Sequence, residues 1–193
     1  MTRDQLKIGD IILTSRPFQK DSRTSVFIKV GTLSRYSHAM VYFGNNIVVE
    51  AVADGVTDEH SVTEATTGCD LATVFRHAKA TPEQLQRVVQ FAKSKVGGAF
   101  AVAGVYGGAG ILAFGLASLA VPLMINRSIT NSITEALRGK RSYFCSELVA
   151  DAYRNAGLPL GRYGNTPSLM NPGDIGEYSD RNPGILQNLG DLK

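Results

Sequence analysis

The chain has 193 residues, of which 44% are hydrophobic and 19% are charged. This length supports one domain with its own hydrophobic core, and we expect residues 1–193 to fold as a single unit. The 20 basic and 17 acidic side chains leave a formal net charge of only +3, without any long Lys/Arg run. A charge this small argues against a nucleic-acid partner.

The two cysteines, Cys69 and Cys145, are too few for the disulfide framework of a small secreted domain. A single disulfide between the two cysteines is an alternative, although free thiols fit synthesis in a reducing compartment better. The first ten residues, MTRDQLKIGD, lack the apolar core of a conventional signal peptide. We therefore expect a protein made in the cytoplasm and then either exported by a specialised secretion system or associated with a membrane.

Metal and cofactor sites are not predicted. The three histidines, His38, His60 and His77, lack close ligand spacing, and no CxxC pair occurs. The glycines between positions 104 and 110 are not followed by the Lys-Ser/Thr pair that a phosphate-binding loop requires. The composition thus favours chemistry carried by the side chains alone.

Strand-like segments dominate the first part of the chain. The hydrophobic patterns predict strands at Ile11–Leu13, His38–Phe43, Ile47–Val52 and Leu71–His77. The sequence Gly44-Asn45-Asn46 between the second and third of these segments is typical of a hairpin turn, because glycine and asparagine tolerate positive φ. We therefore expect His38–Phe43 and Ile47–Val52 to pair.

Two helices are predicted on either side of an unusual stretch. Thr81, Pro82 and Gln84 form a capping signal, and the apolar spacing that follows predicts an amphipathic helix ending near Gly97-Gly98. A second helix is predicted from about Phe144 to Ala156, with its apolar face at Leu148, Val149 and Ala152. The tail after Gly157 is rich in Gly, Pro and Asn, which predicts irregular structure over the domain surface.

The unusual stretch, Val96 to Asn126, carries no charge and contains seven glycines. An insert at about 97–126 is long enough to span a membrane, and its small residues suit close helix packing in lipid. It can equally form two buried helices that cover a site, or an amphipathic lid that meets a membrane or a lipid-like substrate. A mean hydropathy of −0.03 is ordinary for a soluble protein and favours a buried hairpin or lid.

Cys145 is the candidate nucleophile because it lies at the predicted start of a helix. The unpaired N–H groups and the positive end of the helix dipole favour a thiolate there. The same N–H groups can stabilise the oxyanion of a tetrahedral intermediate. The alternative is a small buried side chain that packs a helix.

His38 and Glu50 are the candidate base and the group that orients it. His38 opens a predicted strand, and Glu50 is the single charge of the next strand, so that both can face the same side of a hairpin. A carboxylate between apolar neighbours needs a partner, and orienting an imidazole is the third role of a catalytic triad. A histidine bonded to the backbone and an outward-facing glutamate are the alternatives.

Three stretches together resemble a known family: GDIILT, IKVGTLSRYSHAMVYFGNNIVVEAVADGV and YFCSELVADAYRNAGL. They resemble the circularly permuted, NlpC-type branch of the papain-like superfamily, in particular its YiiX-like members, with a more distant likeness to lecithin:retinol acyltransferase. The resemblance implies an α+β fold in which an antiparallel sheet packs against helices, here with an apolar, glycine-rich helical insert. The chain departs from the family pattern in that insert.

By position, the resemblance implies that Cys145 is the nucleophile, His38 the base and Glu50 the third polar residue. Tyr36 corresponds to an aromatic residue that precedes the histidine in these relatives, and it is a candidate for the site wall or an oxyanion contact. A packing role is the alternative for Tyr36. Ser146, directly after the cysteine, is the second candidate for that contact.

The favoured function is a cysteine amidase or peptidase that acts on peptidoglycan stem peptides through a thioester acyl-enzyme, in keeping with an exported antibacterial effector. An alternative keeps the triad and acts on a lipid ester or acyl group, which the apolar insert favours. A binding module with a decayed site is the third hypothesis. The expected partners are a peptide or acyl substrate and, for an exported effector, a membrane or a secretion or immunity protein.

Overall fold

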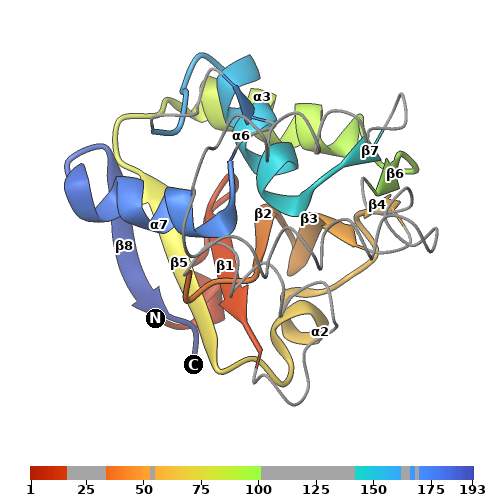
Figure 1. Ribbon diagram of the computed structural model, residues 1–193, viewed down its shortest axis with the longest axis horizontal. Helices are drawn as coiled ribbons and strands as arrows, with labels where there is room; N and C mark the ends of the chain where they lie inside the picture. Colours follow the sequence, from red (N-terminus) through yellow and green to blue (C-terminus); the bar gives the residue numbers. More distant parts are fainter. Residues whose placement is uncertain (17–33, 53–54, 101–141, 162–165, 168–169) are drawn as a thin grey trace, which may run out of the picture.

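A six-stranded antiparallel sheet forms the centre of the computed structural model, which describes residues 1–16, 34–52, 55–100, 142–161, 166–167 and 170–193 (Figure 1). The strand order is β4-β3-β2-β1-β5-β8. Its strands are β1 (Ile11–Ser15), β2 (His38–Gly44), β3 (Ile47–Val52), β4 (Gly55–Thr57), β5 (Leu71–His77) and β8 (Leu186–Asp191). The four strand segments predicted from the sequence are therefore confirmed.

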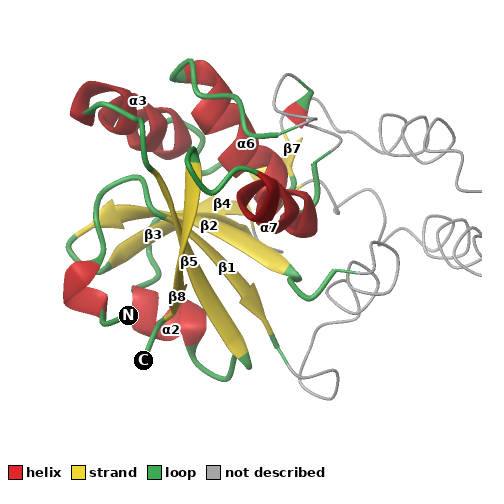
Figure 2. Cartoon of the chain, turned by 90° about the vertical axis from the view of Figure 1, so that its left-hand side faces the viewer, coloured by secondary structure: helices red, strands yellow, loops and turns green. Residues whose placement is uncertain are grey.

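Helices lie on both faces of this sheet. The helices are α2 (Val62–Thr66), α3 (Pro82–Lys93), α6 (Cys145–Asn155) and α7 (Pro172–Arg181), with a short 3-10 turn at Arg3–Gln5. Figure 2 shows α3, α6 and α7 on one side of the strands and α2, with the two chain termini, on the other. The predicted α+β class is thus observed.

Side-chain alternation along the strands divides the core in two. Ile11 and Leu13 of β1 belong to the larger cluster, which they share with the apolar faces of α3 and α6. Ile12 points to the opposite face and joins the smaller cluster with Met40 and Val62. This alternation is the expected period of two in a strand, and each face of the sheet is therefore covered by buried apolar side chains.

Local capping signals define the helix starts. The Thr81 hydroxyl accepts a hydrogen bond from the Gln84 N–H at 3.2 Å, and the Gln84 side chain accepts one from the Thr81 N–H at 3.0 Å. This is the capping box predicted from the sequence. The helix itself ends at Lys93, earlier than expected, and turns lead on to Gly97.

The prediction of irregular structure after Gly157 is wrong for the last part of the chain. Residues Pro172–Arg181 form α7, and residues Leu186–Asp191 form the edge strand β8, which pairs with β5. The side chain of Asn171 accepts a hydrogen bond from the Asp174 N–H at 3.1 Å, so α7 begins with its own cap. The C-terminal tail is therefore part of the sheet.

A buried ion pair ties the start of β1 to β5. The Asp10 carboxylate is almost fully buried and accepts hydrogen bonds from Arg76 Nε at 2.7 Å and from Arg76 Nη2 at 2.6 Å. The Lys7 N–H donates to the same carboxylate at 2.8 Å. Tyr153 of α6 donates its hydroxyl hydrogen to the Gly9 carbonyl oxygen one residue earlier. These bonds fix the turn at Gly9 and Asp10 that precedes β1.

The predicted insert at 97–126 falls mostly on residues outside the described part of the chain. At its start, β6 (Ala99–Phe100) pairs in parallel with β7 (Ser142–Tyr143), which directly precedes α6. Within the described residues, the helices are all too short or too polar to cross a membrane. The three interpretations of the insert therefore stay predictions.

Candidate active site

The hairpin of β2 and β3 brings His38 and Glu50 to one face of the sheet. Asn45 and Asn46 adopt φ values of 51° and 63°, the left-handed conformation that a tight hairpin turn requires. The resulting register places Glu50 opposite Met40, two residues from His38 along β2. Because side chains alternate, His38, Met40 and Glu50 share the face that α2 covers.

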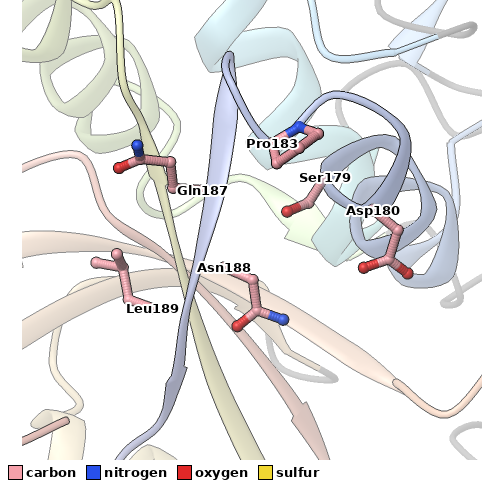
Figure 3. A pocket seen from close by; sticks show the side chains of 6 residues that line it. All are labelled: Ser179, Asp180, Pro183, Gln187, Asn188 and Leu189. Carbon is pink, nitrogen blue, oxygen red and sulfur yellow. The ribbon is translucent and has the colours of Figure 1, made fainter.

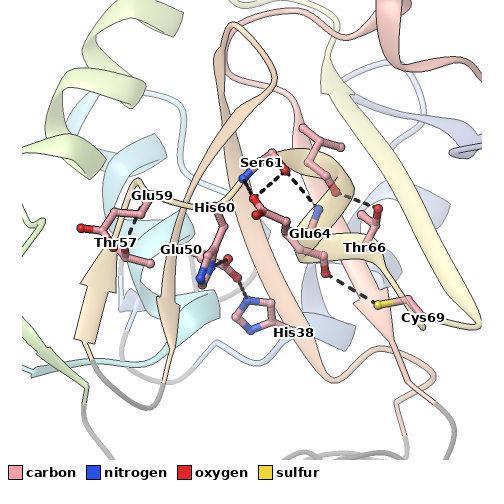
Figure 4. Close-up of polar contacts among 11 residues, drawn as sticks. His38, Glu50, Thr57, Glu59, His60, Ser61, Glu64, Thr66 and Cys69 are labelled. Carbon is pink, nitrogen blue, oxygen red and sulfur yellow. Dashed lines mark hydrogen bonds and ion pairs between the residues drawn. The ribbon is translucent and has the colours of Figure 1, made fainter.

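The side chains of these two residues are in direct contact (Figure 4). His38 Nε2 lies 2.5 Å from Glu50 Oε2, and the Glu50 side chain is only 4% exposed. A buried carboxylate accepts a hydrogen bond from Nε2–H, which leaves Nδ1 as the imidazole nitrogen that can accept a proton. The pairing of His38 with Glu50 that the sequence analysis expected is thus present in the structure.

Cys145 occupies the first position of α6 and contacts the beginning of β2. Its thiol is within hydrogen-bonding contact of the His38 side chain and of the backbone N–H groups of Ala39 and Ser146. The preceding residue, Phe144, provides no side-chain cap for the helix. The sulfur therefore receives the Ser146 N–H, which belongs to the first turn of α6, where a capping side chain could otherwise engage the N–H groups.

The protonation of this pair follows from these contacts. Burial opposes a thiolate, but the charge and hydrogen bond of His38, with the N–H groups of Ala39 and Ser146, lower the pKa of Cys145 below its ordinary value. Burial also opposes a charge on His38, yet Cys145 and Glu50 together raise the pKa of His38 to about 10. The arrangement thus favours a thiolate–imidazolium pair at neutral pH.

Cys145 and His38 differ in their exposure to solvent. Cys145 is 3% exposed, whereas the His38 side chain keeps 22% of its surface exposed. A separate hollow between α7 and β8, shown in Figure 3, contains none of the predicted site residues; it is lined by Ser179, Asp180, Pro183, Gln187, Asn188 and Leu189.

Tyr36 lies in the larger core cluster. Its ring is 2% exposed and makes an edge contact with Phe75 at a centroid distance of 6.0 Å. Its hydroxyl accepts a hydrogen bond from Arg35 at 2.7 Å. These contacts are those of the packing alternative considered for Tyr36.

Ser146 contributes to the site through its backbone. Its side chain is buried, and its hydroxyl donates to the Met170 carbonyl oxygen at 2.7 Å. That bond ties the first turn of α6 to the segment before α7. The backbone N–H of Ser146, by contrast, faces the sulfur of Cys145.

His60 is the one residue of this cluster that the sequence analysis did not assign to the site. Its Nδ1 lies 2.7 Å from Glu50 Oε1, the oxygen that His38 does not use. His60 follows β4 and precedes α2, ten residues after Glu50, and no short motif joins the two. Within the described residues, no group of three or more His, Cys, Asp or Glu side chains is arranged to hold a metal ion.

Comparisons with known proteins find a relative that is named as a peptidase. No protein-family model matches the chain. The chain is similar to the probable lipoprotein peptidase YaeF of Escherichia coli (strain K12). The two are 31% identical over 181 residues, which amount to 83% of this chain and 60% of YaeF. The chain thus spans about three fifths of YaeF, and the observed α+β fold is compatible with a papain-like fold.

Proposed function

We propose that this protein is a cysteine amidase or peptidase of the papain-like, NlpC type, in its circularly permuted form. The single observation that carries the proposal is the placement of His38 between Cys145 and Glu50. The order of these elements, with the histidine strand before the cysteine helix, supports the permuted form. The similarity to YaeF, whose name describes a peptidase, supports the choice of an amide substrate.

In this mechanism Cys145 is the nucleophile. The Cys145 thiolate attacks the carbonyl carbon of the substrate amide, and the carbonyl oxygen becomes an oxyanion. The N–H groups at the start of α6 donate hydrogen bonds to this oxyanion. His38 Nδ1–H then protonates the leaving amine as the C–N bond breaks, and a thioester to Cys145 remains.

Water completes the reaction. Neutral His38 accepts a proton from a water molecule at Nδ1, and the resulting hydroxide attacks the thioester. The thiolate leaves, the acid is released, and the imidazolium–thiolate pair is restored. Glu50 keeps Nε2 protonated throughout, so Nδ1 carries out both transfers.

Peptidoglycan stem peptide is the proposed substrate, and an exported effector that attacks a rival cell is the proposed setting. The test is incubation of purified protein with peptidoglycan, followed by mass spectrometry of the soluble fragments. We expect new amine and carboxyl termini with the wild-type chain and with a Cys69→Ala control, and none with Cys145→Ala. Identical fragment patterns for wild type and Cys145→Ala would refute the assignment.

An acyl ester is the second candidate substrate, and the uncharged stretch Val96–Asn126 is the observation that favours it. The same nucleophile would form the same thioester, but an alcohol would leave in place of an amine. Phospholipid vesicles added to the assay separate the two candidates. Release of fatty acid that depends on Cys145, without cleavage of peptidoglycan, would select the ester.

A further inference from the structure

Glu50 has two histidine partners, one on each carboxylate oxygen. Its Oε2 accepts a hydrogen bond from His38 Nε2 at 2.5 Å, and its Oε1 accepts one from His60 Nδ1 at 2.7 Å. Figure 4 shows the carboxylate between the two imidazole rings. The proposed triad accounts for His38 alone, so the contact of His60 needs an explanation of its own.

The second contact restricts how the carboxylate can turn. The terminal torsion of a glutamate is broad, so a single hydrogen bond leaves the carboxylate free to rotate around that bond. A donor on each oxygen fixes the plane of the group. An almost fully buried carboxylate also pays a desolvation penalty for any oxygen without a donor. His60 therefore holds Oε2 in line with His38 Nε2.

The backbone of His60 is attached to the strand that carries Glu50. The Val48 N–H donates to the His60 carbonyl oxygen at 3.1 Å, and Ser61 forms an isolated bridge with Ile47. Ser61 then caps α2, where its hydroxyl accepts a hydrogen bond from the Glu64 N–H at 3.1 Å. These bonds fix His60 relative to β3 on both sides, so its contact with Glu50 is built into the fold.

We infer that His60 is a positioning residue for the proposed hydrolase: it orients Glu50, which in turn orients His38. The inference rests on the proposed function. His38 itself lowers the pKa of the Cys145 thiol, whereas the hydrogen bond of His60 is to Glu50. His60 therefore influences the nucleophile through Glu50 and His38.

Three substitutions separate the hydrogen bond from the bulk of the side chain. His60→Asn keeps an N–H donor close to the position of Nδ1, whereas His60→Gln places its donor near Nε2, away from Glu50. His60→Ala removes both. His60 is partly exposed, with 45% of its side chain accessible, so all three chains are expected to fold; circular dichroism and thermal unfolding verify this.

The first readout is the rate of alkylation of Cys145 by iodoacetamide as a function of pH, in a Cys69→Ala background. We expect His60→Ala and His60→Gln to reduce the rate at neutral pH by about tenfold, which is the lower end of the loss when a metal-bound histidine is deprived of its outer partner. The midpoint of the profile should move to higher pH, because a misoriented Glu50 stabilises the imidazolium less. His60→Asn should stay within about twofold of the parent.

The second readout is the proton NMR signal of the His38 Nε2–H, which a short hydrogen bond to a carboxylate shifts downfield. His60→Asn should keep this signal, and His60→Ala should move it upfield. If the role of His60 were purely structural, its substitution would lower the melting temperature without changing the pH profile of alkylation or this resonance.

The outcomes separate the two proposals. A wild-type Cys145 that reacts no faster than an ordinary thiol at neutral pH overturns the proposed function and, with it, the role of His60. If Cys145 is reactive in the wild type and all three variants show the same pH profile as the wild type, only the role of His60 is overturned. The same holds if His60→Asn loses as much reactivity as His60→Ala.

Discussion

Glu50 lies directly opposite Met40 across the β2–β3 hairpin, so its contact with His38 runs diagonally between the two strands. Because side chains alternate between faces, a shift of the pairing by one residue would send Glu50 to the opposite face, which α3 and α6 cover, and leave His38 without its carboxylate. The turn at Asn45 and Asn46 fixes this register. The geometry of the candidate site thus depends on a turn outside the site.

The thiolate–imidazolium pair predicts the pH dependence of Cys145. Since the pKa of Cys145 is lowered and that of His38 is raised to about 10, the sulfur should be alkylated faster at neutral pH than an ordinary thiol. An ordinary thiol titrates near pH ~8.5 and reacts slowly there. Alkylation by iodoacetamide from about pH 5 to pH 10, followed by mass spectrometry, measures the profile.

His38→Gln is the control for this profile because it removes the imidazolium and keeps a polar side chain. The reactivity of Cys145 at neutral pH should then fall, and the midpoint should move up toward or beyond that of an ordinary thiol, since burial alone disfavours the thiolate. An unchanged profile in His38→Gln would contradict the pairing.

Glu50→Gln should change the acid stability of the fold. Burial opposes its charge, but the hydrogen bonds and charges of His38 and His60 lower the pKa of Glu50 below its ordinary value of 4.5. The folded state thus binds fewer protons than the unfolded chain. The stabilisation is present above pH 4.5 and is lost as the pH falls through the lowered pKa.

Chemical denaturation at several pH values measures this effect. Wild type should be more stable than Glu50→Gln by about 3 kcal/mol near neutral pH, because the substitution removes one partner of a buried ion pair. The difference should shrink as the solution is acidified. A difference that stays constant down to the acid transition would argue against ionised Glu50 in the fold.

Asp10→Ala should destabilise the fold strongly. The substitution removes a buried carboxylate that accepts hydrogen bonds from Arg76 and from the Lys7 N–H, and it leaves the guanidinium without a counter-charge. Breaking a buried pair in this way costs about 3–5 kcal/mol. Arg181→Ala is the matched control, because its partner Glu177 and Arg181 itself are both exposed, and it should cost less than about 1 kcal/mol. Urea denaturation compares the two.

Gly176→Ala should destabilise α7 although alanine is the better helix former. In an exposed helix this change increases stability by about 1 kcal/mol. At position 176, however, the added Cβ would meet Tyr36 Cε2 at 2.9 Å. The Tyr36 ring is buried and cannot move away easily, so a net loss of about 1–2 kcal/mol is expected. Gly184→Ala, where a Cβ would meet nothing within 4 Å, is the control for thermal unfolding and should be close to neutral.

Local signals in the sequence predict most of the elements that carry the site. The Gly44-Asn45-Asn46 turn and the alternating segments on its two sides predict the β2–β3 hairpin, and the positive φ values of both asparagines agree with this. The capping box at Thr81 predicts the start of α3. Such features act within a few residues, which is why the sequence alone reveals them.

The C-terminal elements show where local signals were misinterpreted. Asn171, Pro172 and Asp174 repeat the capping pattern of Thr81, Pro82 and Gln84, but the surrounding glycines and prolines favoured an irregular tail. The strand β8 is mostly exposed, and only Leu186 of its residues is fully buried. It has little hydrophobic periodicity, and it is a strand because it pairs with β5, which lies far away in the sequence.

His60 was missed for a similar reason. Its contact with Glu50 depends on the return of the chain through β4 and on the bridge between Ile47 and Ser61. Neither feature leaves a pattern of residue types at fixed spacing. A lone carboxylate inside an apolar strand did indicate that Glu50 needs partners, but it did not indicate how many.

The parallel pairing of β6 and β7 bears on how much the length of the stretch between these two strands can change. Ala99 lies beside Ser142, so the residues on either side of the stretch 101–141 are neighbours, next to the helix that bears Cys145. The cost of closing a loop grows only slowly with its length. The six-stranded sheet should therefore keep its register when the length of the stretch between Phe100 and Ser142 is changed.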